Sequence, residues 1–530
     1  MKLKSRACLF GHVLLLFSTL AMAVESSEDS IGTFEIGRFE VVGDTLLGAV
    51  PIAQLLSRYT GKERHFSDVQ QAMESLEGAY RERGFNLVQV LLPEQELNQG
   101  AVRLVVKETR IGKVKVAGNT VFDETNIRQS VPELSEGKIP NFTRISSDLR
   151  LANENSAKKT ALSLQNDGSD GEVNATLQVL DEKAWTAGVM LDNAGNENTG
   201  KTQMTVQYQH FNVANLDHTL SLQFTTTLEQ PSRVGVYGAA YHIPLYGWSD
   251  SLDFYGSYSD VDSGTISAGA FNLQVSGKGS ILGGRYNHNL ARQGNYESKL
   301  VIGLEQKAFQ NNLGFQGVEL GNDVTVRPLS LIYSGDLKQA TGNTSFYLMG
   351  ARNVPGGDHA TESDFSRIRQ GASSNYSLLR YGISHMHTLP SDWQLRALLN
   401  GQITHDSLVP GEQFGAGGAT SVRGFVERAV SDDQGILANL ELYTPSLCAS
   451  DEGSAMQCRL LAFYDAGNVT RNNPLPGERT AVFIASAGIG FRMAVGKTLT
   501  VQMDMGQVLV DSDLQSKGDR RVHLKINLAY

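Results

Sequence analysis

Cysteine, tryptophan and long apolar runs are all scarce in this chain of 530 residues. It has three cysteines and three tryptophans, and 41% of its residues are hydrophobic. Its mean hydropathy of -0.22 is typical of a chain that is in contact with water along much of its length. Only the region near the start is apolar for long enough to approach the length of a membrane helix. The sequence therefore excludes a protein that crosses a membrane with several helices, and it is too long for one ordinary domain.

Recognisable catalytic motifs are also missing. The chain contains no H-E-x-x-H, no G-x-S-x-G and no P-loop, and its 11 histidines form no cluster with metal-ligand spacing. We therefore expect no catalytic residues, no bound metal and no cofactor.

The first 23 residues have the pattern of a secretory signal peptide. Residues 1–6 are basic, residues 7–20 are mostly apolar, and Ala21-Met22-Ala23 is a small-x-small cleavage site, which makes Val24 the first mature residue. The alternative is a short buried helix. Cleavage would remove Lys2, Lys4 and Arg6 and change the formal net charge from -10 to -13. A chain this acidic is a poor partner for nucleic acid.

Two cysteines remain after removal of the signal, because Cys8 leaves with it. Cys448 and Cys458 are ten residues apart in a protein exported to an oxidising compartment, so we predict that they form a local disulfide. A zinc site there would need two more ligands nearby, and the sequence offers none.

A strand-helix-helix-strand-strand pattern occurs twice after a short polar segment, residues 24–33. The first copy covers residues 34–108 and the second covers residues 109–183, a repeat of about 75 residues. Each copy predicts a small sheet with helices on one face. Such a sheet leaves an edge strand open for pairing with an extended polypeptide.

Residues 184–530 change to segments with alternating apolar and polar residues, separated by polar turns. This pattern is typical of a transmembrane β-barrel, with lipid on one face and water on the other. Roughly 340 residues at about 20 per strand and connection give about 17 strands. The count is 16 if residues 268–290 form one strand, and 17 if they form two. Because both ends of the barrel should lie on the same side of the membrane, we predict 16. A soluble β-sandwich or propeller is the alternative.

The same connectivity places the long connections on the outer side of the membrane. They cover about residues 310–322, 354–375 and 407–433, whereas the turn at residues 214–217 is short and falls on the inner side. The turn at residues 444–459, which holds both cysteines, is a long connection on the inner side, and a disulfide would shorten it.

One long connection contains a glycine-rich stretch, residues 411–425, and Arg423 lies near the end of this stretch. Forty residues later a strand carries a lone acid, Asp465, among apolar neighbours, where an unpaired charge would be costly. Arg423 is therefore its predicted partner. The alternative is a solvated loop arginine and an acid that ends a strand at a turn.

These motifs resemble those of the two-partner secretion transporters (the TpsB family), outer-membrane exporters of large haemolysins and adhesins. One motif is Val-Arg-Gly-Phe in the loop, and the second is Phe-x-Asp-x-Gly on the barrel wall. The third lies at the end of the first repeat and resembles the first POTRA domain of these transporters. The matching residues are Val422, Arg423, Gly424 and Phe425; Phe463, Asp465 and Gly467; and Leu87, Val88, Val90, Leu92, Pro93 and Gln95.

The resemblance implies a 16-stranded transmembrane β-barrel preceded by two small α+β POTRA domains. It implies that residues 407–433 fold into the lumen as a gate, held by Arg423 on Asp465. It also implies that the POTRA domains, around residues 87–95, dock the N-terminal secretion domain of an unfolded exoprotein. The protein would lie in the outer membrane of a Gram-negative cell, in contact with lipid and as a monomer. The aromatic C-terminal residue, Tyr530, implies insertion by the outer-membrane assembly machinery.

One departure from the family is visible, because several relatives carry an N-terminal plug helix and a long linker. Here only residues 24–33 precede the first repeat, and ten residues span at most about 36 Å. Closure would then depend on the loop.

Two other functions fit parts of the sequence. An outer-membrane assembly factor of the BamA-like type would share the POTRA domains, the barrel and a similar loop. A ligand-gated porin would explain the barrel but not the repeats.

Overall fold

The computed structural model describes most of the chain from residue 33 onward. The described residues are 33–96, 100–166, 171–197, 199–261, 265–268, 273–276, 278–310, 314–315, 318–319, 323–448, 456–512 and 515–530. The predicted signal peptide, and the polar segment after it up to residue 32, lie outside them. The chain forms two compact units: the first ends at Glu108, and the second runs from Thr109 to Tyr530 and includes residues 83–87. None of the described helices has the length and apolar content needed to cross a membrane.

The first unit is a small sheet with a helix layer. Its three main strands lie in the order β2-β5-β4, and two shorter strands, β1 and β3, pair separately. Helix α2 is amphipathic, and it turns Val69, Ala72, Leu76 and Tyr80 into the core. The elements are β1 (Phe34–Ile36), β2 (Arg38–Val42), α1 (Ala49–Leu56), β3 (Gly61–Arg64), α2 (Phe66–Glu82), β4 (Val88–Leu91) and β5 (Ala101–Glu108).

The second unit begins with a module of the same architecture, in which the strand order is β6-β8-β7. Asp123 and Asn141 cap its two helices by accepting hydrogen bonds from backbone N–H groups of the first turn. The elements are β6 (Arg110–Ala117), α3 (Glu124–Gln129), α4 (Phe142–Ala152), β7 (Lys158–Gln165) and β8 (Glu172–Asp181). We call this part the second module.

A tight turn after the first long strand is repeated in both modules. Gly118 has a φ of +85°, and a Cβ there would lie 2.4 Å from a backbone carbonyl oxygen, so only glycine fits. Thr120, two residues after Gly118, donates its N–H and its hydroxyl to the carboxylate of Asp181 at the end of β8. Gly43 and Glu108 repeat this arrangement in the first unit. The internal repeat thus preserves a specific local contact as well as an element order.

The rest of the second unit is a closed antiparallel barrel. Strands β20 and β21 both pair with β17 and form one interrupted strand, so the barrel has 16 strands, which confirms the predicted fold class. The strands are β9 (Trp185–Asp192), β10 (Gln203–Val213), β11 (His218–Thr227), β12 (Val234–Leu245), β13 (Asp250–Val261), β16 (Lys278–Asn289), β17 (Tyr296–Gln310), β20 (Val324–Val326), β21 (Pro328–Gln339), β22 (Gly342–Asn353), β23 (Ser377–Thr388), β24 (Gln394–Ile403), β27 (Gln434–Tyr443), β28 (Met456–Thr470), β29 (Ala481–Val495), β30 (Leu499–Val508) and β31 (Arg520–Ala529). The barrel closes where β31 pairs with β9.

The region from 268 to 290, which decided the predicted strand count, contributes one strand to the barrel wall. That strand is β16, whereas β14 (Thr265–Ala268) and β15 (Leu273–Ser276) pair with each other as a separate hairpin. A further short hairpin, β18 (Gly314–Phe315) with β19 (Val318–Glu319), lies in the connection after β17.

Side chains of the barrel strands alternate between a buried inner face and an exposed outer face, as a pleated strand requires. On β28, Phe463 and Asp465 are buried, whereas Leu460 and Tyr464 are 48% exposed. The outer face is therefore apolar and suited to lipid, and the inner face carries the charges.

The second module contacts one end of the barrel, which we call the module end. Lys158 of β7 forms a buried ion pair with Asp217 in the turn after β10, and the Tyr246 hydroxyl donates to the same carboxylate at 2.7 Å. Asp148 of α4 accepts the N–H of Gly247 at 3.0 Å. Several polar contacts thus join the second module to the first turns of the barrel.

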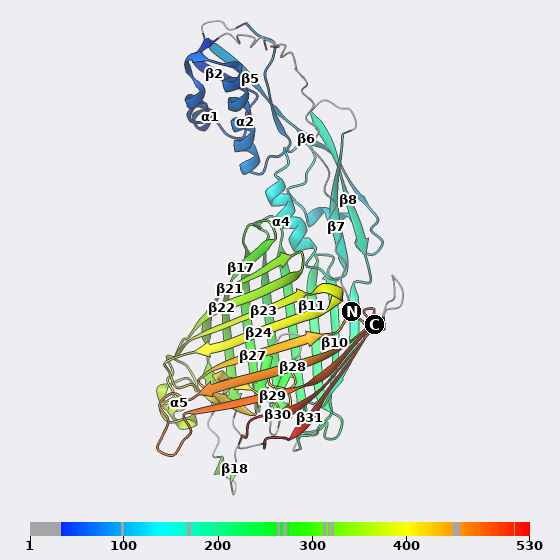
Figure 1. Ribbon diagram of the computed structural model, residues 1–530, viewed down its shortest axis with the longest axis vertical. Helices are drawn as coiled ribbons and strands as arrows, with labels where there is room; N and C mark the ends of the chain where they lie inside the picture. Colours follow the sequence, from blue (N-terminus) through cyan, green and yellow to red (C-terminus); the bar gives the residue numbers. More distant parts are fainter. Residues whose placement is uncertain are drawn as a thin grey trace, which may run out of the picture. The chain divides into compact units, whose positions relative to one another are not determined.

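The connections between strands differ between the two ends of the barrel. Short turns, such as residues 214–217 and 246–249, lie at the module end, and long connections, such as residues 354–376 and 404–433, lie at the opposite far end. Figure 1 shows α4 beside the module end and α5 (Glu362–Ile368) at the far end. Part of the predicted long connection at residues 310–322 lies outside the described residues.

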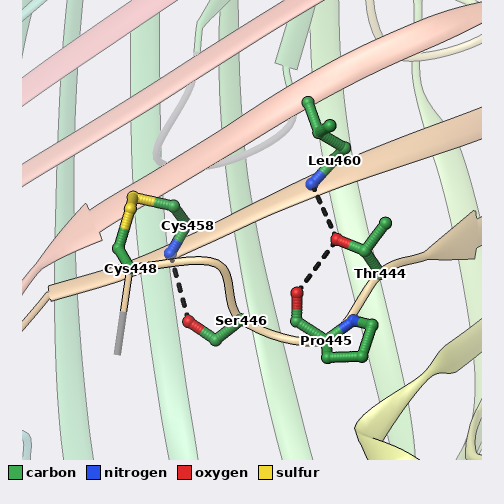
Figure 2. The surroundings of a disulfide bond; sticks show 6 residues. All are labelled: Thr444, Pro445, Ser446, Cys448, Cys458 and Leu460. Atoms are coloured by element: carbon green, nitrogen blue, oxygen red, sulfur yellow. Dashed lines mark hydrogen bonds between the residues drawn. A yellow bond between two sulfur atoms is a disulfide. The ribbon is translucent and has the colours of Figure 1, made fainter. Parts of the chain in front are cut away.

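The turn between β27 and β28 is the long connection at the module end, and it contains a disulfide (Figure 2). Cys448 and Cys458 are bonded, with their Cα atoms 5.2 Å apart. Beside the disulfide, the N–H of Cys458 donates to Ser446 Oγ at 3.4 Å, and the N–H of Leu460 donates to Thr444 Oγ1 at 3.1 Å. The bond therefore closes this turn next to a strand end that is already hydrogen-bonded.

Candidate functional site

The connection between β24 and β27 folds back into the barrel lumen. We call residues 407–433 the lumen loop. Its two arms pair as β25 (Phe414–Ala416) and β26 (Val430–Asp432), so the loop enters as a narrow hairpin. The apolar residues near its tip pack against inward-facing side chains of β27 to β30. This cluster contains Ala416, Val422, Phe425, Leu437, Val469, Ile484 and Val508.

Arg423 and Asp465, predicted as partners, are in direct contact at the tip of the lumen loop. The guanidinium Nε donates to Asp465 Oδ2 at 2.7 Å, and Nη2 donates to Oδ1 at 2.8 Å. The backbone N–H of Arg423 also donates to Oδ2, at 3.1 Å. Both side chains are almost fully buried, at 4% and 0% exposure. This two-pronged geometry is the strong form of an arginine-carboxylate contact.

Two further acids share the Arg423 guanidinium. Nη1 lies 2.8 Å from Glu441 of β27 and 3.5 Å from Asp504 of β30. Arg396 of β24 pairs with Glu441 at 3.1 Å, and Arg492 of β29 pairs with Asp504 at 2.9 Å. Including Asp465, the cluster contains three arginines and three acids. The charges balance, which is the condition under which buried charges are tolerated.

The other motif residues provide the space and the surface for this contact. The Arg423 guanidinium carbon lies 3.6 Å from the centre of the Phe463 ring, close enough for a cation-π interaction. A Cβ on Gly467 would lie 3.2 Å from Val422 of the loop, so glycine at this position leaves room for the loop to pack. Gly424, with a φ of +93°, meets Gly506 of β30 backbone to backbone.

Two polar side chains bind the backbone just after Arg423. His523 of β31 accepts the Gly424 N–H on Nε2 at 2.9 Å. Gln515, in the connection before β31, donates to Gly424 O at 2.7 Å and accepts the Val426 N–H at 3.2 Å. These contacts hold the backbone of residues 424–426 to β31 and to the connection before it.

The residues predicted to dock a partner lie around β4 in several different environments. Val88 and Val90 point into the core of the first unit, and Leu87 packs against the core of the second module. Gln95 bonds the backbone of Arg103 twice, at 2.7 and 2.8 Å, beside β5. Leu92 and Pro93 are partly exposed after β4. Three of these six side chains, Val88, Val90 and Gln95, therefore have a role in holding the sheet of the first unit.

The sequence did not indicate Glu441, Asp504, Arg396, Arg492, Gln515 or His523 as members of the site. Each is a single polar residue in an alternating strand or a loop, like many others in the chain. Only the register between strands identifies them: Glu441 stands opposite Phe463, and Asp504 opposite Gly490. One usable signal is that four of them, Arg396, Glu441, Arg492 and Asp504, are charged residues at inward positions of their strands. In the part of the chain that is described, no group of three or more histidine, cysteine, aspartate or glutamate residues could hold a metal ion.

Comparison with solved structures finds a similar fold in several proteins. CdiB from Escherichia coli superposes with a TM-score of 0.75 at 20% identity, over 96% of this chain and 93% of that one. CdiB from Acinetobacter baumannii gives 0.70 at 17% identity, over 94% and 90%. BamA from Haemophilus ducreyi is more distant, with a TM-score of 0.53 at 15% identity, over 94% of this chain and all of that one.

Sequence comparison finds related transporters along most of the chain. The heme/hemopexin transporter protein HuxB of Haemophilus influenzae is 21% identical over 485 residues, covering 89% of this chain and 81% of that protein. The outer membrane transporter CdiB of Escherichia coli is 24% identical over 428 residues, covering 77% and 69%.

Two family models match the chain. Residues 34–109 match the ShlB-type POTRA domain. The larger match, to the haemolysin secretion/activation proteins ShlB/FhaC/HecB, covers residues 171–493, which is more than half of the chain, and the protein therefore belongs to this family of two-partner secretion transporters.

Proposed function

We propose that the lumen loop is the gate through which this outer-membrane transporter secretes a large partner exoprotein. The observation that supports this gate is the position of the loop tip against the inner wall of the barrel. There the Arg423 guanidinium is hydrogen-bonded to Asp465 and also contacts Glu441 and Asp504. A barrel of 16 strands would otherwise enclose a water-filled passage. An ion pair suits a gate because its partners can separate and rejoin without covalent change.

The exoprotein would arrive unfolded in the periplasm, bind the POTRA modules through its N-terminal secretion domain, displace the loop tip and pass outward. No nucleotide is required, since folding outside can give the movement its direction. The chain would act as a monomer, without cofactor or catalytic activity and without nucleic acid. It would be surrounded by lipid and would depend on the outer-membrane assembly machinery for insertion.

Docking is proposed on an open sheet edge of the first unit. β4, the strand predicted from the sequence, is one edge, but its Val90 N–H already donates to Glu77 at 2.9 Å. β2 is the other edge, and a groove of about 630 Å³ runs between β2 and α1, next to Phe39, Val41 and Ile52. An extended segment that paired with β2 would lie in this groove. The groove therefore favours β2 over β4 as the docking edge.

Secretion and membrane-protein assembly can be separated in cells. We would produce the protein together with a candidate large exoprotein, and measure the exoprotein in the medium and other barrel proteins in the outer membrane. If the protein is an exporter, the exoprotein should reach the medium only when the transporter is present, and the amounts of other barrel proteins in the outer membrane should not change. A general loss of barrel proteins without the transporter, with no effect on the exoprotein, would instead support the BamA-like assembly function.

A further inference from the structure

The root of the lumen loop has a charged anchor of its own, separate from the one at Arg423. Glu412, in the arm that enters the lumen, is 1% exposed. Its carboxylate lies 3.0 Å from Lys307 of β17 and 3.2 Å from Arg380 of β23. Here the loop supplies the acid and the wall supplies the bases, the reverse of the arrangement at the tip.

The outgoing arm is anchored next to Glu412 by Asp433, which is fully buried. The Asp433 carboxylate accepts hydrogen bonds from both terminal nitrogens of Arg369, one of them at 2.8 Å. It also accepts the backbone N–H of Leu408 and of Asn472, each at 2.7 Å. These four donors come from three different far-end connections, so Asp433 joins the loop root to its neighbours.

Gln402 of β24 connects the two arms. Its side-chain nitrogen donates to the carbonyl oxygen of Glu412 at 3.1 Å and to that of Asp433 at 2.8 Å. We call Glu412, Asp433 and Gln402 the root cluster. Both arms of the hairpin therefore leave the wall from one fixed point.

The root cluster and the tip contacts lie at different depths and on different strands. Lys307, Arg380 and Gln402 lie near the far ends of β17, β23 and β24. Asp465 and Asp504 lie near the middle of β28 and β30. A chain that entered from the module end would therefore reach the tip contacts before the root cluster.

We propose that the root cluster is the hinge of the gate: it keeps the loop attached to the wall while the Arg423 contacts release the tip, so that the loop swings and returns. This inference rests on the proposed gating function. Its physical basis is position, because Gln402 binds both arms of the hairpin where they leave the wall, whereas the contacts of Arg423 hold only the tip. A few residues at the ends of an element are the usual place for such a pivot.

The test uses spin labels at two exposed loop positions, Pro410 beside the root and Thr420 at the tip. Since Cys448 and Cys458 are bonded to each other, a cysteine introduced at either position is the only free thiol once the predicted signal peptide with Cys8 is gone. Label mobility would be measured in lipid nanodiscs for the labelled wild type, Arg423→Ala, the Glu412→Gln/Asp433→Asn double variant, and all three changes together.

We expect Arg423→Ala to raise the mobile fraction at position 420 roughly tenfold and to leave position 410 nearly unchanged. The root double variant should mobilise position 410, and the triple variant should mobilise both. Equal mobilisation of both positions in Arg423→Ala would overturn the hinge, as would an immobile position 410 in the root double variant. Glu427→Gln is the matched control, since Glu427 is an acid of the same loop that accepts the Ala419 N–H and makes no ion pair with the described residues.

Single-channel recording separates the hinge from the gate. If the loop is the gate and the root cluster is its hinge, Arg423→Ala gives brief reversible openings of the channel. Adding Glu412→Gln and Asp433→Asn should then lengthen these openings roughly tenfold. If the labels move as expected but the conductance never changes, the hinge stands and the gating function is wrong. Openings of unchanged duration in the triple variant would contradict the hinge.

Discussion

The first unit and the barrel bury opposite kinds of side chain. In the first unit, Leu76 and Leu104 are fully buried and the core is apolar. In the barrel, Asp465 and Arg423 are just as inaccessible, whereas Leu460 and Tyr464 face outward. The difference follows from the surroundings, because water surrounds the module while lipid surrounds the barrel.

This contrast indicates how each part can move. An apolar core is held by many non-directional van der Waals contacts, and its close packing leaves no alternative arrangement of similar energy. The lumen is held by specific charge pairs, and each pair can separate if water or another chain takes the place of its partner. A polar interior is therefore compatible with a passage that opens, and four substitutions test the contrast.

The largest stability effect should come from Lys158, a charge buried where the second module meets the barrel. Lys158→Met leaves Asp217 buried without its cation, so we expect the joint to lose about 3–5 kcal/mol. Hydrogen exchange of the second module in the full-length protein would measure this loss. Lys159→Met is the matched control on the exposed face of the same strand. Equal protection in the two variants would show that the buried pair does not hold the joint.

A substitution in the apolar core of the first unit should have the next largest effect. Leu104→Ala removes a fully buried side chain from β5 and should lower the free energy of unfolding by about 2–5 kcal/mol. Leu91→Ala, at a side chain that is 45% exposed, should cost much less. Exchange rates of the first-unit amides would report both, and channel conductance should not change. Altered conductance in Leu104→Ala would weaken the division between a structural core and a functional lumen.

Acid should destabilise the second module through Asp181, by a smaller amount. Burial alone would raise the pKa of Asp181, but hydrogen bonds from the N–H groups of residues 120–122 and the Thr120 hydroxyl lower it to about 2. Because the folded-state pKa is depressed, this stabilisation is present above the unfolded value and is lost between about pH 4 and pH 2. Asp181→Asn should remove that part of the pH dependence in exchange measurements. An unchanged pH profile would exclude Asp181 as its source.

The smallest effect should come from Tyr464, which faces outward beside Asp465 on the same strand. Tyr464→Leu exchanges one apolar outward side chain for another, and we expect a change below about 1 kcal/mol in heat stability and none in conductance. A conductance change as large as that of Asp465→Ala would show that the strand as a whole, and not its inner face, controls closure.

The sequence predicted the architecture because the relevant signals are local. Alternation of apolar and polar residues indicates a barrel strand by strand, and the repeated strand-helix-helix-strand-strand pattern marks two similar modules. The pairing of Arg423 with Asp465 was predicted from the cost of an unpaired acid on the strand and from motif resemblance, and the structure places these two residues in contact. Strand β3 had no such signal, since Gly61-Lys-Glu-Arg64 is entirely polar or glycine.

The remaining site residues could not be predicted because they depend on long-range register. Glu441 and Asp504 meet Arg423 only after β27 to β30 have paired, and a shift of one residue would turn either side chain toward lipid. The buried pair of Lys158 with Asp217 joins two parts of the chain whose sequences give no indication of contact.

Single-channel conductance of the Arg423 and Asp465 variants tests the central claim most directly. We would record the wild type, Arg423→Ala, Asp465→Ala and the double variant in planar bilayers. A loop held in the lumen by this pair predicts large, fluctuating openings in each single variant and little further change in the double variant, because either substitution already breaks the contact. Conductance that stays at the wild-type level in all three variants would contradict the gate.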